Sequence, residues 1–392
     1  MPTRQNRLRW LGRYDSGIVQ KTKLDIILFL FCSIIFAVFS SGGSEEQPTD
    51  TIITVIVDKR GGRVDWSHTN NIITHCRYGY DGYYDLWTMN PDGSGAKCLT
   101  GNKPGIPQLH NGQPTWHSSG KYIVFQSQDP ALPHTKEIDY AYTEAGHGLH
   151  NNLWITNPEG DKFYQLTKIK IGGAILHPCF SRDGKRLLWS EKVGKNSLDW
   201  AIKIADFIET PTPHLGNIKS YQPAGKTWYE AHEFSVDGSK ILCTIGSGTE
   251  AYYNYDIWEM DMATQKLIQL TNTQDEWDEH AHYSPDGKKI SWISSKGYPY
   301  NPSKWGLTLK TDLWIMDADG SNKERITYFN EPGYQEYTGK QMVMSDNSWG
   351  PDGKKIVAII MAPKMGRKSA QIVIIDLKKA LLRSKKKVVS YN

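Results

Sequence analysis

Cysteine and net charge are both scarce in this chain of 392 residues. Its five cysteines fit neither a disulfide framework nor a Cys-x-x-Cys metal site, and there is no Cys-x-x-Cys-His sequence for covalent haem attachment. We expect the cysteines after the N-terminal segment to be buried thiols. The formal net charge of +4 lies wholly in residues 1–41, so the rest of the chain is neutral. A neutral domain lacks the basic surface of a nucleic-acid-binding protein, and we expect no nucleic-acid partner.

Sequence signatures of the common catalytic folds are absent too. We find no Gly-x-Ser-x-Gly or His-Glu-x-x-His sequence, and no phosphate-binding or dinucleotide-binding glycine loop in a fitting context. Function must therefore come from a site that the fold assembles from separate segments.

The one long apolar run, Ile26–Phe39, follows six basic residues and precedes small residues at 40–43. This order is typical of a secretory signal, and the run is shorter than the roughly 20 residues of a membrane span. We therefore predict a signal peptide over residues 1–41, with an uncleaved signal anchor as the alternative. The remainder is predicted to be periplasmic or otherwise extracytoplasmic, meeting a membrane only through an uncleaved segment.

A four-part pattern recurs along the rest of the chain. Asp-Gly stands between two apolar runs, as in Phe180–Lys185, Phe234–Ser239, Tyr283–Lys288 and Trp349–Lys354. A third run carries a tryptophan, as in Asp85-Leu86-Trp87, and a fourth ends in Leu-Thr or Ile-Thr. Asp-Gly between apolar runs predicts a β-hairpin, and repeated units of four strands predict the blades of a propeller.

We therefore predict an all-β fold, a six-bladed β-propeller of four-stranded antiparallel blades over residues 62–392, with seven blades as the alternative. Residues 42–61 are predicted to be a linker, in which a strand at Thr51–Val57 closes the ring against the last blade. The blades are expected at about 62–100, 112–167, 175–222, 229–272, 277–330 and 345–390.

The repeated sequences resemble those of a known propeller family. Tyr283–Lys288 (YSPDGK) and Leu86–Gly93 (LWTMNPDG) resemble the PD40 (WD40-like) repeats of TolB-type periplasmic β-propellers, over about residues 62–380. The resemblance implies the fold, whereas propellers of this type have many unrelated roles.

The longer connections are predicted to leave the propeller on the face opposite the Asp-Gly turns. They are rich in tyrosine and small residues, a composition that suits protein contacts, and packing over neighbouring blades is the alternative role. The predicted partner-binding residues are Glu250, Tyr252, Tyr253, Tyr255, Tyr140, Tyr142, His147, His150, Tyr298, Tyr300 and Trp305. The architecture and the loop with Glu250 also resemble the propeller β-subunit of hydrazine synthase, which implies a non-catalytic subunit of a multi-haem redox complex.

Histidines stand near the start of the innermost strand in three consecutive blades: His177, His232, His280 and His282. Imidazoles that converge among carboxylates suit a metal site or a general base, and we expect this group on the loop-rich face. Manganese, calcium and zinc are the predicted ions. The structural alternative is that each histidine bridges strands where blades meet.

The strings His177-Pro178, His232-Glu233-Phe234 and His280-Ala281-His282 resemble those of oligogalacturonate lyases. This resemblance implies a metal-dependent lyase acting on acidic oligosaccharides. Two functions thus follow from the sequence: first an exported protein-binding scaffold or complex subunit, and as the alternative this lyase.

Overall fold

The computed structural model describes residues 51–143, 147–246, 255–273, 275–301 and 304–389. The chain divides into two units, Met1–Thr49 and Asp50–Asn392, and the predicted signal segment lies outside the described residues. Within the described ranges, no helix has both the length and the apolar character that crossing a membrane requires.

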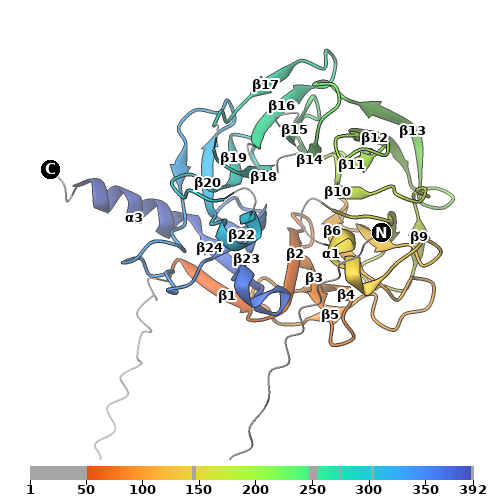
Figure 1. Cartoon of the computed structure of the whole chain (residues 1–392), viewed down its shortest axis with the longest axis horizontal. Helices are drawn as coiled ribbons and strands as arrows, with labels where there is room; N and C mark the ends of the chain where they lie inside the picture. Colours follow the sequence, from red (N-terminus) through yellow and green to blue (C-terminus); the bar gives the residue numbers. More distant parts are fainter. Residues whose placement is uncertain (1–50, 144–146, 247–254, 274, 302–303, 390–392) are drawn as a thin grey trace, which may run out of the picture. The chain divides into compact units, whose positions relative to one another are not determined.

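Six four-stranded antiparallel sheets form the blades of a propeller, which confirms the predicted fold and its number of blades (Figure 1). Within each of the first five blades the strands follow one another in chain order, from the innermost to the outermost. The first blade contains β2 Gly61–Trp66, β3 Ile73–Tyr78, β4 Tyr84–Met89 and β5 Lys97–Cys98, and the second contains β6 Asn111–Trp116, β7 Ile123–Gln128, β8 Asn151–Thr156 and β9 Phe163–Gln165. The third contains β10 Ile175–Phe180, β11 Arg186–Lys192, β12 Trp200–Ile208 and β13 His214–Tyr221, and the fourth contains β14 Tyr229–Phe234, β15 Lys240–Ile245, β16 Asp256–Asp261 and β17 Leu267–Gln269. The fifth contains β18 Asp278–Tyr283, β19 Lys289–Ser294, β20 Asp312–Asp317 and β21 Glu324–Arg325, and the sixth contains β22 Val343–Trp349, β23 Lys355–Met361, β24 Gln371–Asp376 and β1 Ile53–Val57.

The two ends of the described chain close the ring together. Strand β1 pairs antiparallel with β24, with Ile53 opposite Ile375 and Val55 opposite Val373. The outer edge of β24 is therefore occupied, so the residues after Asp376 have no free edge to join. They form helix α3, Leu377–Val389, where the sequence prediction extended the last blade to residue 390.

The recurring threonine at the end of the fourth strand ties it to the third strand in several blades. Thr100 donates a hydrogen bond from its hydroxyl to Asp85 (2.7 Å) and accepts one from the backbone N–H of Leu86 (3.0 Å). Thr327 bonds to Asp312 in the same way (2.7 Å). The motif is structural, since a buried hydroxyl or carboxylate needs such partners.

The Asp-Gly turns are structural as well. In the third blade Ser181 donates a hydrogen bond to Asp183 (2.6 Å), which also accepts the N–H of Lys185 (3.0 Å). Gly184 has φ of 72°, a conformation that glycine adopts without steric cost. None of the four described cysteines forms a disulfide. Cys76 and Cys243 are buried, as predicted, whereas Cys98 and Cys179 are only partly buried.

One buried histidine outside the channel makes stability depend on pH. His75 donates from Nδ1 to the carbonyl of Cys76 (3.2 Å), its Nε2 has no partner among the described residues, and burial lowers its pKa to about 4. Unfolding lets it take up a proton, so acidification from pH 6.5 to 4 destabilises the fold by about 3 kcal/mol through this residue.

Between pH 7 and pH 4, the free energy of unfolding of the wild type should therefore fall by about 3 kcal/mol more than that of His75→Phe. Urea unfolding at the two pH values measures the difference. Equal losses in both proteins would contradict the assignment.

Candidate metal centre

Every innermost strand of the propeller carries a one-residue bulge. A bulge redirects the side chain of its extra residue, and bulges are common beside active sites. Gln113, His177 and His280 adopt positive φ angles of 50°, 52° and 56° there, which is uncommon for residues other than glycine. The bulged positions are Gly62–Arg63, Gln113–Pro114, His177–Pro178, His232, His280–Ala281 and Ser345.

The bulges of the third, fourth and fifth blades bring four potential metal ligands together. His177, Glu230, His232 and His280 offer one ligand atom each, and these atoms all lie within 4.8 Å of one another. The side chains of Glu230 and His280 are 1% and 3% exposed, whereas that of His177 is 10% exposed. The group is therefore inside the protein, and His177 is on its more accessible side.

Hydrogen bonding fixes the proton of His232. The Thr244 hydroxyl donates to the backbone carbonyl of Asp278 (3.3 Å), so it accepts from His232 Nε2–H (2.8 Å). The other ring nitrogen, Nδ1, therefore carries a lone pair, and it is buried without a partner among the described residues. A partner that fixes one histidine nitrogen so that the other is free to bind a metal is a usual feature of metal sites.

Glu230 likewise has a buried acceptor atom without a hydrogen-bond partner among the described residues. Its Oε1 lies against His177 Nε2, whereas its Oε2 has no hydrogen-bond partner within the described part of the chain. Burial alone would raise the Glu230 pKa, but His177 beside it lowers the pKa to about 2, so the group is an anion. A buried anion without hydrogen bonds is costly unless a cation accompanies it.

The neighbouring groups are held neutral. Burial lowers the pKa of His232 and His280 well below the ordinary value for histidine. Burial and the charge of Glu230 raise the pKa of Glu279 well above its ordinary value. Neutral imidazoles beside one carboxylate are the protonation states that bind a metal.

Arg63 competes with a metal for His177. Its guanidinium donates from Nη1 to His177 Nδ1 (2.9 Å), which places the ring proton on Nε2, the atom that faces Glu230. Ligation through Nε2 needs that proton moved to Nδ1, where it would meet the guanidinium N–H. His177 can therefore join the ligand set only when Arg63 turns away.

The sequence prediction placed His282 among the metal ligands, but the group of four contains Glu230 in its place. His282 lies beside the group. Its Nδ1 lies 3.6 Å from Glu233, and its Nε2 lies 4.0 Å from Asp346. Burial alone would lower its pKa, but Glu233 beside it outweighs burial and raises the pKa. His282 is therefore placed as a proton donor or acceptor beside the group rather than as a ligand.

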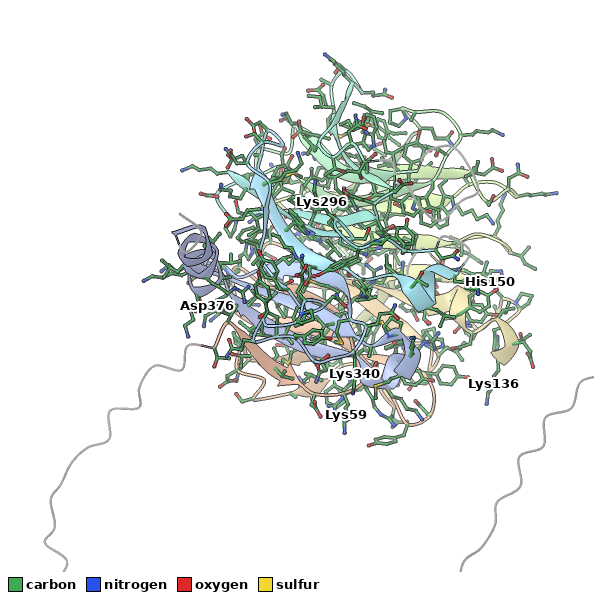
Figure 2. The ribbon with its side chains drawn as sticks, turned by 60° about the vertical axis from the view of Figure 1, so that its left-hand side comes forward. Lys59, Lys136, His150, Lys296, Lys340 and Asp376 are labelled. Atoms are coloured by element: carbon green, nitrogen blue, oxygen red, sulfur yellow. The ribbon has the colours of Figure 1, made fainter. Side chains whose placement is uncertain are left out.

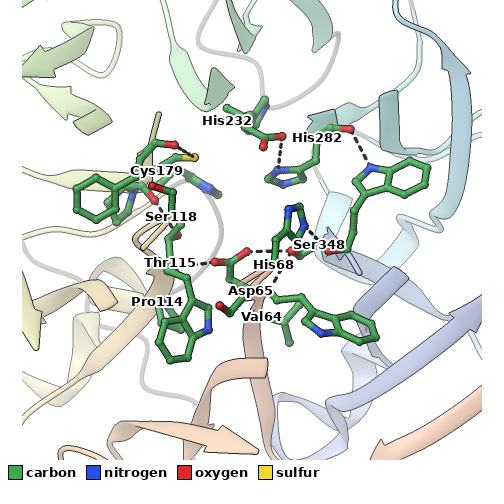
Figure 3. Close-up of a pocket in the computed structure, with 18 of the residues that line it drawn as sticks. Val64, Asp65, His68, Pro114, Thr115, Ser118, Cys179, His232, His282 and Ser348 are labelled. Carbon is green, nitrogen blue, oxygen red and sulfur yellow. Dashed lines mark hydrogen bonds and ion pairs between the residues drawn. The ribbon is translucent and has the colours of Figure 1, made fainter. Parts of the chain in front are cut away.

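A cavity of about 300 Å³ reaches His177, His232 and His282 from the side of the Asp-Gly turns. All six blades contribute to it through the later halves of their innermost strands and the first residues of some of the turns. His232 and His282 lie across the cavity from Val64 and Pro114 (Figure 3). The expectation that the histidines open on the loop-rich face is thus wrong, because their accessible side faces the later halves of the strands.

Two arginines that sequence reasoning missed also line this cavity. They are Arg63 and Arg182, each supplied by the innermost strand of its blade or the turn after it. Arg182 donates from Nη1 to His68 (2.8 Å), while its Nη2 is buried, 3.6 Å from Glu233, without a hydrogen bond among the described residues. Each is five residues from a histidine in the sequence: Arg63 precedes His68, and Arg182 follows His177 in the same hairpin.

The predicted partner-binding residues fall into three groups. Tyr142, His150 and Tyr255 are buried, so we do not retain them as contact residues. Figure 2 labels His150 together with Lys136, which belongs to the same long loop of the second blade. Glu250, Tyr252 and Tyr253 lie outside the described residues. The others lie on described loops: Tyr140, His147, Tyr298, Tyr300 and Trp305, the last of which begins the short helix α2, Trp305–Thr308.

No family model matches the chain. Two curated proteins named dipeptidyl-peptidase 5 are similar to it. The protein of Porphyromonas gingivalis is 25% identical over 229 residues, which cover 54% of this chain and 33% of that protein, and the protein of Porphyromonas endodontalis is 26% identical over 249 residues, which cover 53% and 32%. The chain therefore spans about a third of the length of the curated relatives it matches.

Solved structures share its fold. A protein described as TolB from Agrobacterium tumefaciens matches with a TM-score of 0.50 and 16% identity, over 81% of this chain and 90% of that one. TolB from Acinetobacter baumannii gives 0.49 and 18%, over 81% and 63%. An oligogalacturonate lyase in complex with manganese gives 0.48 and 11%, over 83% and 93%. At such identities the similarity shows the fold alone.

Proposed function

We propose that this TolB-like β-propeller binds one divalent metal ion in its channel and acts there on a small anionic ligand. One observation carries the proposal: among the described residues, His232 Nδ1 and Glu230 Oε2 are buried acceptors without hydrogen-bond partners, and both residues belong to a group whose ligand atoms lie within 4.8 Å of one another. Acceptors gathered in this way need a cation.

The donor set fits such an ion. Around a tetrahedral ion with metal–ligand distances of about 2.1 Å, the ligand atoms lie roughly 3.4 Å apart. Binding therefore needs the wider pairs to close, His177 Nε2 and Glu230 Oε1 to separate, and Arg63 to turn away from His177. Three imidazoles and one carboxylate suit zinc, iron or manganese, whereas calcium prefers oxygen ligands alone. Of the three predicted ions, zinc and manganese are therefore retained. When bound, the ion would supply Lewis-acid chemistry at the end of the cavity.

The chain's own residues would do the rest. Arg182 offers an unpaired, buried N–H group to a carboxylate or similar anion in the cavity. His282, bordered by Glu233 and Asp346, would hold or accept a proton. The cavity of about 300 Å³ is at the lower limit of ligand sites and suits a small ligand or the end of a longer one.

The test is elemental analysis of the full chain, saturated with zinc or manganese and then desalted. We expect one ion per chain, and near zero for His232→Ala. His75→Phe, a change at another buried histidine, should keep the ion. No bound ion, or an unchanged content in His232→Ala, would overturn the proposal.

The lyase function is the specific form of this proposal. It predicts metal-dependent release of an unsaturated product from an oligogalacturonate, with Arg182→Gln raising KM at least tenfold. Metal binding without any such product would leave the metal centre standing and exclude this substrate.

A second candidate function is the scaffold, and surface composition favours it. Tyr140, Leu307 and Met365 are 49%, 57% and 58% exposed, and their loops line the same end of the channel. A photo-crosslinker at position 307 in the native host should capture one partner repeatedly, and the same group at exposed Ile218 should not. Membership of a redox complex and an extracytoplasmic location remain predictions.

The hydroxyl that fixes the proton of His232 gives a further expected result. Thr244→Val keeps the shape of the side chain but removes the acceptor for His232 Nε2–H. We expect metal affinity to fall about tenfold to a hundredfold, as when other outer partners of ligands are lost. Competition with a chromophoric chelator measures it, and an unchanged affinity would mean that His232 binds through the other nitrogen or not at all.

A further inference from the structure

A second cavity, of about 290 Å³, lies at the opposite end of the channel. Arg63 and Gln113 line both cavities and therefore form the partition between them. The second cavity is bordered by the first halves of innermost strands in the first, second and sixth blades, and by loop residues such as Tyr142 and Leu309. It thus belongs to the loop-rich face and is separate from the metal centre.

Its walls are largely apolar. Leu309, Val343, Ile359, Met361 and Ala370 all line it, and three of them are at most 4% exposed. Three glycines of the inner strands also line it: Gly61, Gly62 and Gly112. An apolar cavity of this size with few polar groups is the usual form of a small-molecule site.

One polar group in the wall lacks a partner. Asn151 is 3% exposed, and its Nδ2 donates to the carbonyl of Tyr142 (2.8 Å), which fixes the orientation of the amide. Its Oδ1 is therefore the free end, and it has no hydrogen bond among the described residues. Thr143 Oγ1, also in the wall, has none either. A buried acceptor of this kind calls for an N–H or O–H donor.

The charged groups around the cavity are already compensated. His110 donates from Nε2 to Asp139 (2.7 Å), and Arg367 pairs with the same carboxylate. Burial lowers the pKa of His110, so it adds no charge of its own. Arg63 keeps its charge and donates to His177 at the partition. Apart from Arg63, a ligand here has no unbalanced charge to meet.

We propose that this cavity binds an uncharged small molecule with an apolar, ring-sized body and one N–H or O–H donor, which bonds to Asn151 Oδ1. The walls supply the apolar contact, and Asn151 Oδ1, the free acceptor whose direction is fixed by the bond to Tyr142, sets the orientation of the ligand. This site shares Arg63 with the metal centre, so binding is measured on the metal-free chain in excess chelator.

The probe is N-phenyl-1-naphthylamine, an uncharged apolar amine with one N–H group whose fluorescence rises in apolar surroundings. We expect saturable binding to one site on the full chain. Gly112→Leu should weaken binding at least tenfold, because the new side chain occupies the cavity. A Cβ at that position would meet only Cys76, at 3.7 and 3.9 Å, so the backbone accommodates it. Ile268→Ser, at an exposed position on another blade, should bind within twofold of the wild type.

The role of Asn151 is tested separately. Asn151→Leu should bind the probe about tenfold more weakly, and the N-methylated probe, which lacks the donor, should show a similar loss with the unaltered protein. The second measurement does not depend on whether the variant folds. Absence of saturable binding, or equal binding by Gly112→Leu, would overturn the site, and equal affinity for the two probes would overturn the assigned hydrogen bond.

Discussion

Glu230→Gln is expected to weaken metal binding at least a hundredfold and to leave the propeller folded. The substitution removes the one anion among the four ligands and puts an amide in the same volume. Buried charge without hydrogen bonds costs stability, so the metal-free variant should unfold at the same temperature as the metal-free wild type or higher. Isothermal titration with zinc measures the affinity, and thermal unfolding in excess chelator measures the stability.

Glu279→Gln is the matched control for this result. Glu279 is also buried, on the neighbouring innermost strand, and its raised pKa keeps it protonated. An amide in place of a neutral carboxylic acid should change metal affinity by less than threefold. If Glu279→Gln lost the ion and Glu230→Gln kept it, the ligand set would be wrong.

Deleting residues 51–57 is expected to destabilise the whole propeller. The deletion removes β1, which pairs with β24 and closes the ring, together with the buried Ile52. We expect a loss of about 3–5 kcal/mol, a Tm lower by roughly 5–10 °C, and partial self-association through the exposed edge of β24. Calorimetry and light scattering measure these effects.

Val55→Lys is the control for the deletion. Val55 lies in the same strand but is 47% exposed, so its side chain should matter little. We expect its stability to stay within about 0.5 kcal/mol of the wild type. A deletion variant as stable and monomeric as Val55→Lys would show that the sixth blade does not need its fourth strand.

The sequence predicts the fold well because the repeat is periodic. Asp-Gly turns mark a hairpin in most blades, and the strand at 51–57 has the right composition to complete the last one. The end of the last blade was missed for a physical reason. Whether residues after Asp376 form a strand depends on which segment occupies the edge of β24, and that is a contact between the two ends of the described chain.

The site was predicted only in part. His177, His232 and His280 follow from their places before the aromatic that ends each innermost strand. The presence of Glu230 in the group, in place of His282, does not follow from the sequence, because it depends on bulges that shift the register by one residue.

An anomalous difference map from zinc-soaked crystals of the full chain would show directly whether the proposed metal centre exists. We expect one strong peak in the channel, bound by a Glu230 oxygen and by Nδ1 of His232, with Nε2 still bonded to Thr244. A peak bound through His232 Nε2, or no peak between Glu230 and His232 at saturating zinc, would contradict it.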